Sequence, residues 1–447
     1  MKIDFALKPI DLAPAVQRLF ELATAKTAML ERRWNPADGA PVFTREGRYT
    51  ARGWTQWTQG FQFGNALLCF DLTNDSALLR IGRDHTVSEM AEHVSHTGVH
   101  DHGFNNVSTY GQLRRLMLER RIAANEWELR FYELALKLSG AVQAARWTRL
   151  PEGEGFIHSF NGPHSLFVDT VRTLRALAVA HKLGHALVGE QDERISLLDR
   201  LLAHARATAK YNVFYGEGRD AYDVSELRGR TAHEAVFNTV NGSFRCPSSQ
   251  QGYSPFSTWT RGLGWAMLGF AEQMEFVASL AGEQESRAMM ERAARATGDF
   301  YIEQAAAADG VCYWDTGAPE LHCLGAWRER AADPFNDFEP VDASASAIAA
   351  QGLIRLGHVL GADGARYLQA GLTVARTLMQ EPYLSTNPAH EGILLHSVYH
   401  RPNGWDYVAP GRKTPSGESS MWGDYHLLEL GLLVARMGAG GYYRFFD

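Results

Sequence analysis

Two aspartates stand in sequence contexts that favour acid–base chemistry. Asp101 follows His100 in a stretch bracketed by Gly98 and Gly103, which predicts a helix end and a tight turn that direct side chains into a cavity. Asp169 lies between apolar residues at the start of a predicted amphipathic helix, where burial and a nearby carboxylate would both raise its pKa. We therefore expect Asp169 to keep its proton near neutral pH and to act as a general acid. The alternative is an ordinary first-turn aspartate stabilised by the helix dipole.

A cluster of histidines precedes the first of these acids. His93, His96 and His100 are spaced at i, i+3 and i+7, so on a helix they would share one face and invite a metal ion. We expect no metal, because no second carboxylate cluster with ligand spacing follows them. The alternative is a loop of solvated or hydrogen-bonded histidines.

A third polar segment combines an amide, a cation and two indoles. It contains Gln251, followed by Trp259, Arg261 and Trp265. Arg261 is suited to hold a carboxylate through two parallel hydrogen bonds, and Trp265 is suited to stack on a sugar ring. A buried helix start with a structural arginine is the alternative.

The elements that must position these residues are mostly helices. Apolar residues recur with a helical period in about twelve segments, near 11–33, 57–72, 76–97, 104–121, 124–143, 164–183, 189–209, 257–281, 283–308, 342–361, 363–380 and 421–437. Strands are expected only at 211–215 and 235–240. Such a pattern predicts six antiparallel hairpins, each with an apolar stripe to bury against its neighbours. We expect one all-α domain over residues 1–447, a closed (α/α)6 barrel. An open solenoid is the alternative, but the tandem similarity that it needs is missing.

The overall composition is that of a globular protein with a mild negative charge. The chain has 447 residues, with 44 Lys and Arg against 51 Asp and Glu, a formal net charge of −7. This argues against a nucleic-acid or anionic-membrane surface, which would need an excess of basic residues. The 4 cysteines include no Cys-x-x-Cys pair, and no apolar run is long enough to span a membrane. Asp4 and Lys8 interrupt the first apolar residues, so no signal peptide is indicated and we expect a cytoplasmic protein.

Six segments, in chain order, resemble motifs of the unsaturated glucuronyl hydrolases, glycoside hydrolase family 88. They are Trp57-Thr58-Gln59-Gly60-Phe61, His100-Asp101-His102-Gly103-Phe104, Val168-Asp169-Thr170, Gln251-Gly252-Tyr253-Ser254 with Trp259 to Trp265, Asp342-Ala343-Ser344-Ala345, and Glu418 to Tyr425. The resemblance extends from about Trp54 to the C-terminus and implies an (α/α)6 barrel, in agreement with the helix pattern. It also implies an enzyme that removes a terminal 4,5-unsaturated uronic acid from an oligosaccharide made by a polysaccharide lyase.

The same resemblance implies a role for each candidate residue. Asp169 would protonate C4 of the C4=C5 double bond and then take a proton from the water that attacks C5. Asp101 would bind ring hydroxyls as a carboxylate and help to keep Asp169 protonated. The remaining candidates would contact the sugar or the water: Trp57, His100, Phe160, His233, Gln251, Arg261 and Trp265. No cofactor or metal is required, and the partner implied is the unsaturated oligosaccharide.

Departures from the family pattern leave the substrate open. Phe160 stands where the family commonly has Trp, and Leu263 stands where it has Gln. The loop at 397–402 lacks the second Ser and the Lys with which some relatives recognise sulfate. The alternatives are an unsaturated rhamnogalacturonyl hydrolase of the same fold, a sugar epimerase or isomerase that uses a histidine pair, and a non-catalytic carbohydrate-binding barrel. The source glycan, the linkage and the oligomeric state also stay open.

Overall fold

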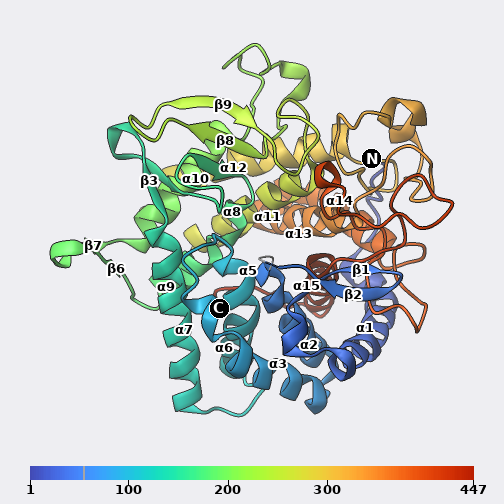
Figure 1. The fold of residues 1–447 in the computed structure, drawn as a ribbon, viewed down its shortest axis with the longest axis horizontal. Coiled ribbons are helices and arrows are strands. Elements are labelled where there is room, and N and C mark those ends of the chain that lie inside the picture. The colour runs from blue at the N-terminus through green and yellow to red at the C-terminus, as the bar shows by residue number, and fades with distance from the viewer. Residues whose placement is uncertain (54–55) are drawn as a thin grey trace.

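The computed structural model describes residues 1–53 and 56–447, which are mostly helical (Figure 1). Trp54, where the family resemblance begins, lies outside the described residues. Six helical stretches are buried along most of their length and form an inner ring. They are α2 (Gln59–Thr73), α5 (His102–Asn106) continued by α6 (Gln112–Leu118), α8 (Thr170–Thr173) continued by α9 (Arg175–Lys182), α11 (Thr260–Val277), α13 (Ala343–Leu360) and α15 (Met421–Gly438). Successive members pack against each other, and α15 packs against α2, which closes the ring.

An outer layer of helices alternates with the inner ring along the chain. It consists of α1 (Ala13–Arg33), α3 (Ser76–Glu89), α7 (Glu126–Ala145), α10 (Leu197–Tyr211), α12 (Gln284–Phe300) and α14 (Ala365–Leu378). These helices bury one stripe only: in α12, Met290, Ala293 and Thr297 are buried while most charged side chains face outward. An amphipathic helix must cover its apolar stripe, whereas a helix apolar all round belongs in the interior. The arrangement confirms the predicted (α/α)6 barrel.

Short strands lie in the connections between helices. Three hairpins pair β1 (Pro41–Arg45) with β2 (Arg48–Ala51), β3 (Trp147–Arg149) with β4 (Gly155–Ile157), and β6 (Leu187–Val188) with β7 (Arg194–Ile195). In a separate antiparallel sheet, β8 (Glu234–Phe237) lies between β5 (Ser165–Phe167) and β9 (Phe244–Ser248).

Several expectations about local structure need correction. The strand expected at 235–240 corresponds to β8, but it ends at Phe237. The strand expected at 211–215 is wrong, because α10 continues to Tyr211 and only Val213 forms an isolated bridge. The helix expected at 164–183 begins at Thr170, because the residues before it pair with β8 as strand β5. At β5 and β8, pairing with a segment distant in sequence decided the local conformation.

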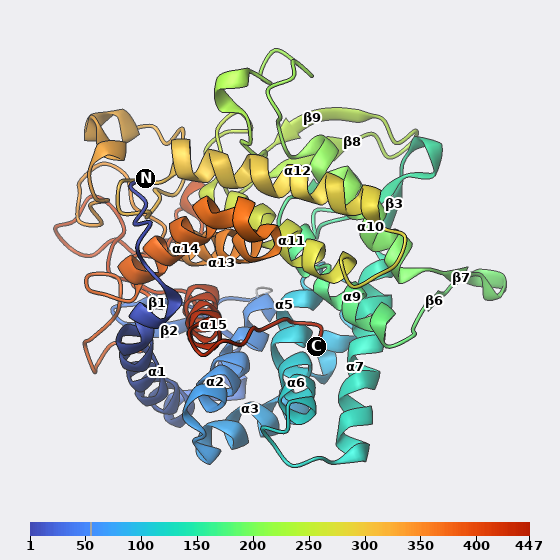
Figure 2. The same ribbon diagram turned by 180° about the vertical axis from the view of Figure 1, so that it is seen from behind.

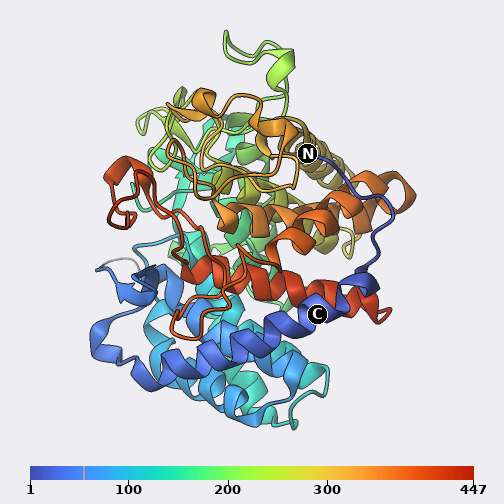
Figure 3. The same ribbon diagram turned by 90° about the vertical axis from the view of Figure 1, so that its right-hand side faces the viewer.

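The two ends of the barrel differ. Figure 3 shows the β1–β2 region and the long connections before α15 at one end of the helices, with the C-terminus toward the other. Figure 2, the view from behind, shows the C-terminal segment running past α15 toward α6. There the guanidinium of Arg355 donates to the carbonyl oxygen of Tyr443, and the ammonium of Lys182 donates to that of Phe446. The C-terminal segment therefore covers one end, and the connections shape the other.

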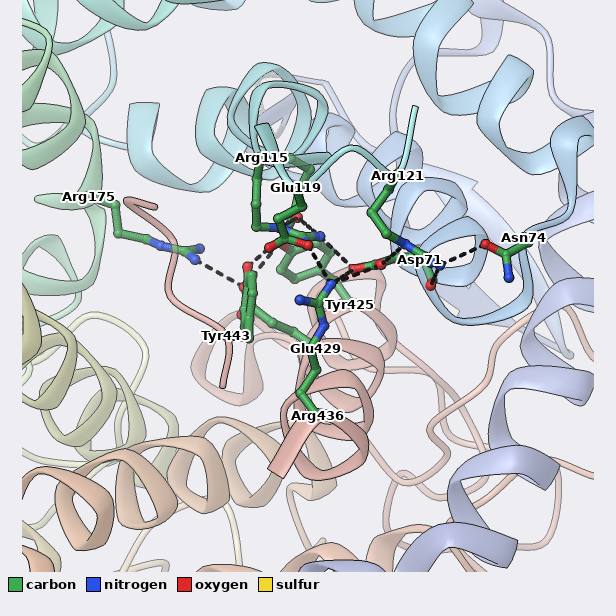
Figure 4. Close-up of polar contacts among 11 residues, drawn as sticks. Asp71, Asn74, Arg115, Glu119, Arg121, Arg175, Tyr425, Glu429, Arg436 and Tyr443 are labelled. Atoms are coloured by element: carbon green, nitrogen blue, oxygen red, sulfur yellow. Dashed lines mark hydrogen bonds and ion pairs between the residues drawn. The ribbon is translucent and has the colours of Figure 1, made fainter. Parts of the chain in front are cut away.

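A network of buried charges lies between the inner helices and the C-terminal segment (Figure 4). The carboxylate of Glu429 on α15 accepts hydrogen bonds from Arg172 and Arg175, each at 3.0 Å, and from the hydroxyl of Tyr443 at 2.9 Å. Asp71 on α2 forms ion pairs with Arg115, Arg121 and Arg436. Buried charges are tolerated only when they are paired, so this network fixes the relative positions of the helices that contribute to it.

Among the described residues, no helix has both the length and the apolar character needed to cross a membrane.

Candidate active site

Both predicted acids lie at the N-terminal ends of neighbouring inner helices. Asp101 precedes α5 and Asp169 precedes α8, and neither carboxyl group caps its own helix. The helices approach closely because Gly103 has no side chain: a Cβ atom there would lie 2.2 Å from the carbonyl oxygen of Thr173. Both acids line one cavity of about 820 Å³. Asp169 does lie at a helix N-terminus, where the helix dipole favours its charged form, as the alternative has it, but it also lines the cavity.

His100 lies between the two carboxyl groups. Its Nε2 is 3.5 Å from Oδ1 of Asp169 and 3.7 Å from Oδ1 of Asp101, distances typical of ion pairs rather than hydrogen bonds. The imidazole ring is only 1% exposed and packs against the rings of Phe160 and Phe167. Within residues 1–53 and 56–447, neither ring nitrogen has a hydrogen-bond partner. His100 therefore faces both acids with its hydrogen-bonding capacity unused.

The three groups perturb one another's pKa. Burial raises the pKa of Asp101, and the neighbouring Asp169 carboxylate adds to the effect, while His100 opposes it without reversing it. Burial would also raise the pKa of Asp169, but the adjacent His100, together with His233, outweighs it and holds that pKa below its ordinary value. Burial lowers the pKa of His100, yet the two carboxylates outweigh it and raise that pKa overall.

This result corrects one sequence-based expectation. We expected Asp169 to be the acid that resists ionisation and Asp101 to be the carboxylate. In the unliganded protein the directions are reversed, because His100 lies beside Asp169 and stabilises its charged form. The two acids do meet at one cavity, as expected, but the imidazole between them decides which one ionises first.

Aromatic rings form much of the cavity wall. Trp57, Phe160 and Trp265 line it, as expected. Trp57 stacks on Trp422 with ring centres 5.1 Å apart, and Trp265 packs against Phe104 at 4.8 Å. These contacts fix the orientation of the two indoles, of which Trp57 is half-buried and Trp265 is buried.

His233 has a defined tautomer. The backbone N–H groups of Gln250 and Gln251 donate to its Nδ1 at 2.9 and 3.3 Å, so the ring proton must be on Nε2. Burial lowers the pKa of His233 to about 4, which keeps the ring neutral near pH 7. Its Nε2 is buried and has no hydrogen-bond partner in the described part of the chain. His233 lies behind the cavity wall rather than in it, whereas Gln251 lines the cavity.

Arg261 lines the cavity, but its donors are largely occupied. One terminal nitrogen donates to Asp342 at 2.8 Å and to the carbonyl oxygen of Val398. The other donates to the side chain of Gln251 at 3.0 Å and to the carbonyl oxygen of Tyr399 at 2.7 Å. Since only the Nε–H is left, the expected two-bond grip on a carboxylate is not available in this arrangement. Arg261 instead holds the loop 397–402 against the barrel.

One part of the wall was missed by the sequence analysis. Tyr399, His400, Asn403 and Trp405 line the cavity together with residues from the inner helices. The departure from the family pattern at 397–402 was noted from the sequence, but the sequence could not predict that this loop lies at the cavity. Its position depends on Arg261, which lies 138 residues away from Tyr399 in sequence, so only the tertiary structure reveals the contact.

The histidine cluster does not share one helical face. His93 lies on α4 (Ala91–Val94) and bonds to Gln59 and Asn105, whereas His102 begins α5 and bonds to Ser139. The chain is not helical between 95 and 101, so the alternative of a loop with hydrogen-bonded histidines describes this segment. In the part of the chain that the structure describes, no three His, Cys, Asp or Glu side chains are grouped to hold a metal ion.

Comparisons with known proteins agree with this architecture. No protein-family model matches the chain. The chain is 26% identical to an unsaturated glucuronyl hydrolase of Bacillus sp. (strain GL1) over 410 residues, which cover 89% of this chain and 90% of that protein. The structure of an unsaturated glucuronyl hydrolase specific for heparin matches with a TM-score of 0.73 at 19% identity, covering 96% of this chain and 99% of the other.

A third relative was solved with a ligand. It is a mutant unsaturated glucuronyl hydrolase from Streptococcus agalactiae complexed with dGlcA-GalNAc6S, with a TM-score of 0.63 at 20% identity, covering 93% of this chain and 90% of the other. Sequence similarity over most of the chain and a shared barrel together identify this protein as a relative of the unsaturated glucuronyl hydrolases, glycoside hydrolase family 88.

Proposed function

We propose that this protein is a glycoside hydrolase that releases a terminal 4,5-unsaturated uronic acid from an oligosaccharide by hydrating the C4=C5 vinyl ether. One observation carries the proposal: Asp101, Asp169 and His100 meet at the wall of a single aromatic-lined cavity. Residues 1–447 act as one catalytic domain, and the chemistry uses no metal or cofactor.

Hydration requires a proton at C4 and a hydroxyl group at C5. Asp169 gives its proton to C4, and the electron pair of the double bond forms the new C–H bond, which leaves positive charge shared by C5 and the ring oxygen. Water then adds at C5 and returns a proton to the Asp169 carboxylate, so the acid is regenerated. The resulting hemiketal opens to a ketone at C5 and a hemiacetal at C1, which expels the aglycone as an alcohol.

Asp169 is ionised in the unliganded site, and we expect it to take up its proton when the substrate binds. The substrate carboxylate brings negative charge into the cavity and the sugar ring displaces water, and both effects raise the pKa of Asp169. His100, whose own pKa is raised, lies 3.5 Å from Asp169 and supplies the positive charge that these two effects must outweigh. Since Asp101 also holds its proton more readily than an ordinary aspartate, the three groups titrate as one unit.

The remaining residues bind and orient the substrate. Trp57 and Trp265 stack on the apolar faces of the sugar, and Asp101 accepts hydrogen bonds from ring hydroxyls. The neutral His233 offers a fixed Nε2–H donor behind Asp169. Gln251, whose side-chain oxygen accepts from Arg261, is oriented with its amide nitrogen available to the water or the sugar.

A panel of unsaturated disaccharides from different lyases tests the function. Hydration destroys the conjugation between the double bond and the carboxylate, so the ultraviolet absorbance of the substrate disappears. We expect Asp169→Asn to lower turnover by roughly 10²- to 10⁴-fold, the usual contribution of a general acid–base group. The matched control is Asp199→Asn, an exposed aspartate on α10, which leaves turnover unchanged.

The outcomes separate the alternatives. A fully active Asp169→Asn protein contradicts the assignment. A product of unchanged mass indicates an epimerase, and binding without turnover of any member of the panel indicates a carbohydrate-binding barrel. Hydrolysis confined to unsaturated rhamnogalacturonan disaccharides assigns the protein to the other hydrolase class of this fold.

A further inference from the structure

The outer helix α7 carries a second apolar stripe on the side turned away from the barrel. Its barrel side buries residues such as Tyr132, Leu136 and Gly140. Its other side exposes four large apolar side chains: Trp127 is 81% exposed, Phe131 43%, Leu134 55% and Leu138 45%. Their spacing of i, i+4, i+7 and i+11 places all four on one face of the helix. An outer helix needs one apolar stripe to pack on the barrel, so the fold itself does not require this second stripe.

The exposed stripe sets α7 apart from other outer helices. The helices α10, α12 and α14, which the structure describes in full, expose no large apolar side chain. Large apolar side chains have full areas of roughly 150–250 Å², so the four exposed fractions on α7 leave roughly 400 Å² of apolar surface in one strip. The largest apolar patch on a typical soluble monomer covers about 300–600 Å² and is often functional. The stripe on α7 is therefore large enough to be a binding surface.

The order of the four side chains along the stripe is complementary to a second copy of itself. If two α7 helices pack in opposite directions around a twofold axis at residues 132–133, Trp127 of one copy lies opposite Leu138 of the other. The same axis places Phe131 opposite Leu134, because the two residues are equally far from it along the helix. Each contact then pairs an aromatic ring with a leucine and occurs twice. A parallel pair would instead place each side chain against its own copy.

The charges that flank the stripe favour the same antiparallel arrangement. Glu126 lies at the N-terminal end of α7, where its ion pair with Arg130 is mostly exposed and therefore contributes little to stability. Lys137 lies near the C-terminal end, close to His185 and Arg194: burial lowers the pKa of His185, and the charges of Lys137 and Arg194 add to that effect. Because Glu126 and Lys137 are 11 residues apart, they lie on the same flank of the helix. Antiparallel packing brings Glu126 of each copy beside Lys137 of the other, whereas parallel packing brings like charges together.

The β6–β7 hairpin adds to the surface available beside α7. Strand β6 packs against α7, and the hairpin projects from the barrel (Figure 1). Val188 on β6 is exposed. A two-stranded hairpin is only marginally stable by itself in water, so a second copy that covers it would stabilise it. The stripe supplies about half of the roughly 800 Å² that each partner buries in a stable interface, and the hairpin extends that surface.

We propose that α7 is the interface of a homodimer, in which the apolar stripes of two copies pack in opposite directions around a twofold axis. Trp127 and Phe131 are its aromatic anchors, since large aromatic side chains dominate the binding energy of interfaces. No residue of α7 is among the described residues that line the catalytic cavity, so dimer formation does not use the catalytic residues. The proposal is therefore independent of the proposed function.

Sedimentation velocity at protein concentrations from about 0.1 to 100 μM tests the proposal, because interfaces of standard size dissociate in the micromolar range or below. We expect the wild-type protein to sediment with twice the mass of the chain at the upper end of this range. Leu134→Glu places a charge near the centre of the stripe in both copies, so it should raise the Kd of the dimer by at least about 100-fold. Trp127→Glu is a second variant at a site so exposed that the fold does not depend on it. Leu227→Glu is the matched control, an exposed leucine outside α7, and should leave the Kd unchanged.

Charge reversal tests the antiparallel arrangement. We expect Glu126→Lys and Lys137→Glu each to raise the Kd by about 5- to 25-fold, because an exposed ion pair contributes up to about fivefold and occurs twice in the dimer. The double variant should recover the wild-type Kd, since opposite charges again face each other across the interface. Unfolding midpoints give an independent measure: that of the wild-type protein should rise with protein concentration, and that of Leu134→Glu should not.

Two sets of results would overturn the proposal. One is a wild-type protein that stays monomeric over the whole concentration range, or a dimer whose Kd is the same in Leu134→Glu and Trp127→Glu as in the wild type. The other is a double charge reversal that does not restore the Kd, which contradicts the antiparallel packing. If the monomeric protein binds phosphatidylcholine vesicles and Leu134→Glu does not, the stripe belongs to a lipid surface and not to a dimer.

Discussion

Replacing His100 with Gln is expected to move the alkaline limb of the pH–activity profile to higher pH. His100 lies 3.5 Å from Asp169 and stabilises its ionised form, against the effect of burial. Without this imidazole, burial and the neighbouring carboxyl of Asp101 remain, and both disfavour the charged form of Asp169. A general acid must be protonated to work, so kcat/KM falls as the pH rises through its pKa. A higher pKa therefore keeps the variant active at higher pH.

The size of the shift follows from the separation of the two groups. Two unit charges about 4 Å apart interact by about 4 kcal/mol at an effective dielectric constant of about 20. One pKa unit corresponds to about 1.36 kcal/mol, which sets an upper limit of about 3 units. Water that enters the cavity weakens the interaction, so we expect a shift of the limb between about 1 and 3 units.

The assay is kcat/KM against pH, measured by the loss of ultraviolet absorbance of an unsaturated disaccharide. Whatever the absolute rate of His100→Gln, the position of the limb is the informative quantity. His158→Gln is the control: burial lowers the pKa of His158 to about 4, so its loss removes no charge near pH 7. A limb that stays in place, or moves to lower pH, in a variant with the wild-type unfolding midpoint would refute the reasoning.

Three further predictions concern stability and the shape of the site. Glu429→Gln should lower the free energy of unfolding by about 3 kcal/mol, because it removes one of the two buried carboxylates, Glu429 and Glu272, that neutralise Arg172 and Arg175. Burial would raise the pKa of Glu429, but Arg175 and Arg172 hold it well below its usual range. The stabilisation is therefore complete above the ordinary glutamate pKa and decreases as the pH falls toward the folded-state value. In denaturant melts between pH 3 and 8, the difference between the two proteins should be constant at the upper end and narrow toward pH 3. Gly103→Ala should lower the free energy of unfolding by about 1–3 kcal/mol and reduce kcat/KM, because the new methyl group forces α5 and α8 apart. An unchanged unfolding midpoint would contradict the close approach of these two helices. Arg261→Lys should raise KM while the protein still folds, because one ammonium group cannot reach all four acceptors that the guanidinium binds. A KM equal to that of the wild type would argue against a role of Arg261 in holding the loop 397–402.

Much of the barrel was predictable from local pattern. Segments such as Gln284–Phe300 and Ala365–Leu378 carry apolar residues at helical spacing, and each forms an outer helix near its expected bounds. The errors occur where a distant partner overrides the local pattern. Ser165–Phe167 has the apolar character of the helix that follows it but pairs with Glu234–Phe237 as a strand. The helix expected near 76–97 ends early, because the chain turns toward the catalytic cavity before Asp101.

For the two candidate acids, the local position was also predictable from the sequence, whereas their contact in space was not. Asp169 was predicted at the start of a helix and lies there, whereas Asp101, predicted at a helix end followed by a tight turn, lies at the start of α5. Their meeting at one cavity depends on how the inner helices pack around the ring, and in particular on the contact between Gly103 and Thr173.

By itself, the sequence of this protein determined the helical barrel, the order of its chemical segments and the residue types available for acid–base work. Those properties depend on short-range periodicity and on side-chain chemistry, which every segment carries on its own. The tertiary structure alone decided which aspartate ionises first and which acceptors bind the N–H groups of Arg261. It also decided that Arg45 lies over the ring of Tyr407 and Arg52 over the ring of Trp405. Proton affinity and hydrogen-bond occupancy depend on burial and on neighbours many residues away, and the fold brings those together only when the ring of helices closes.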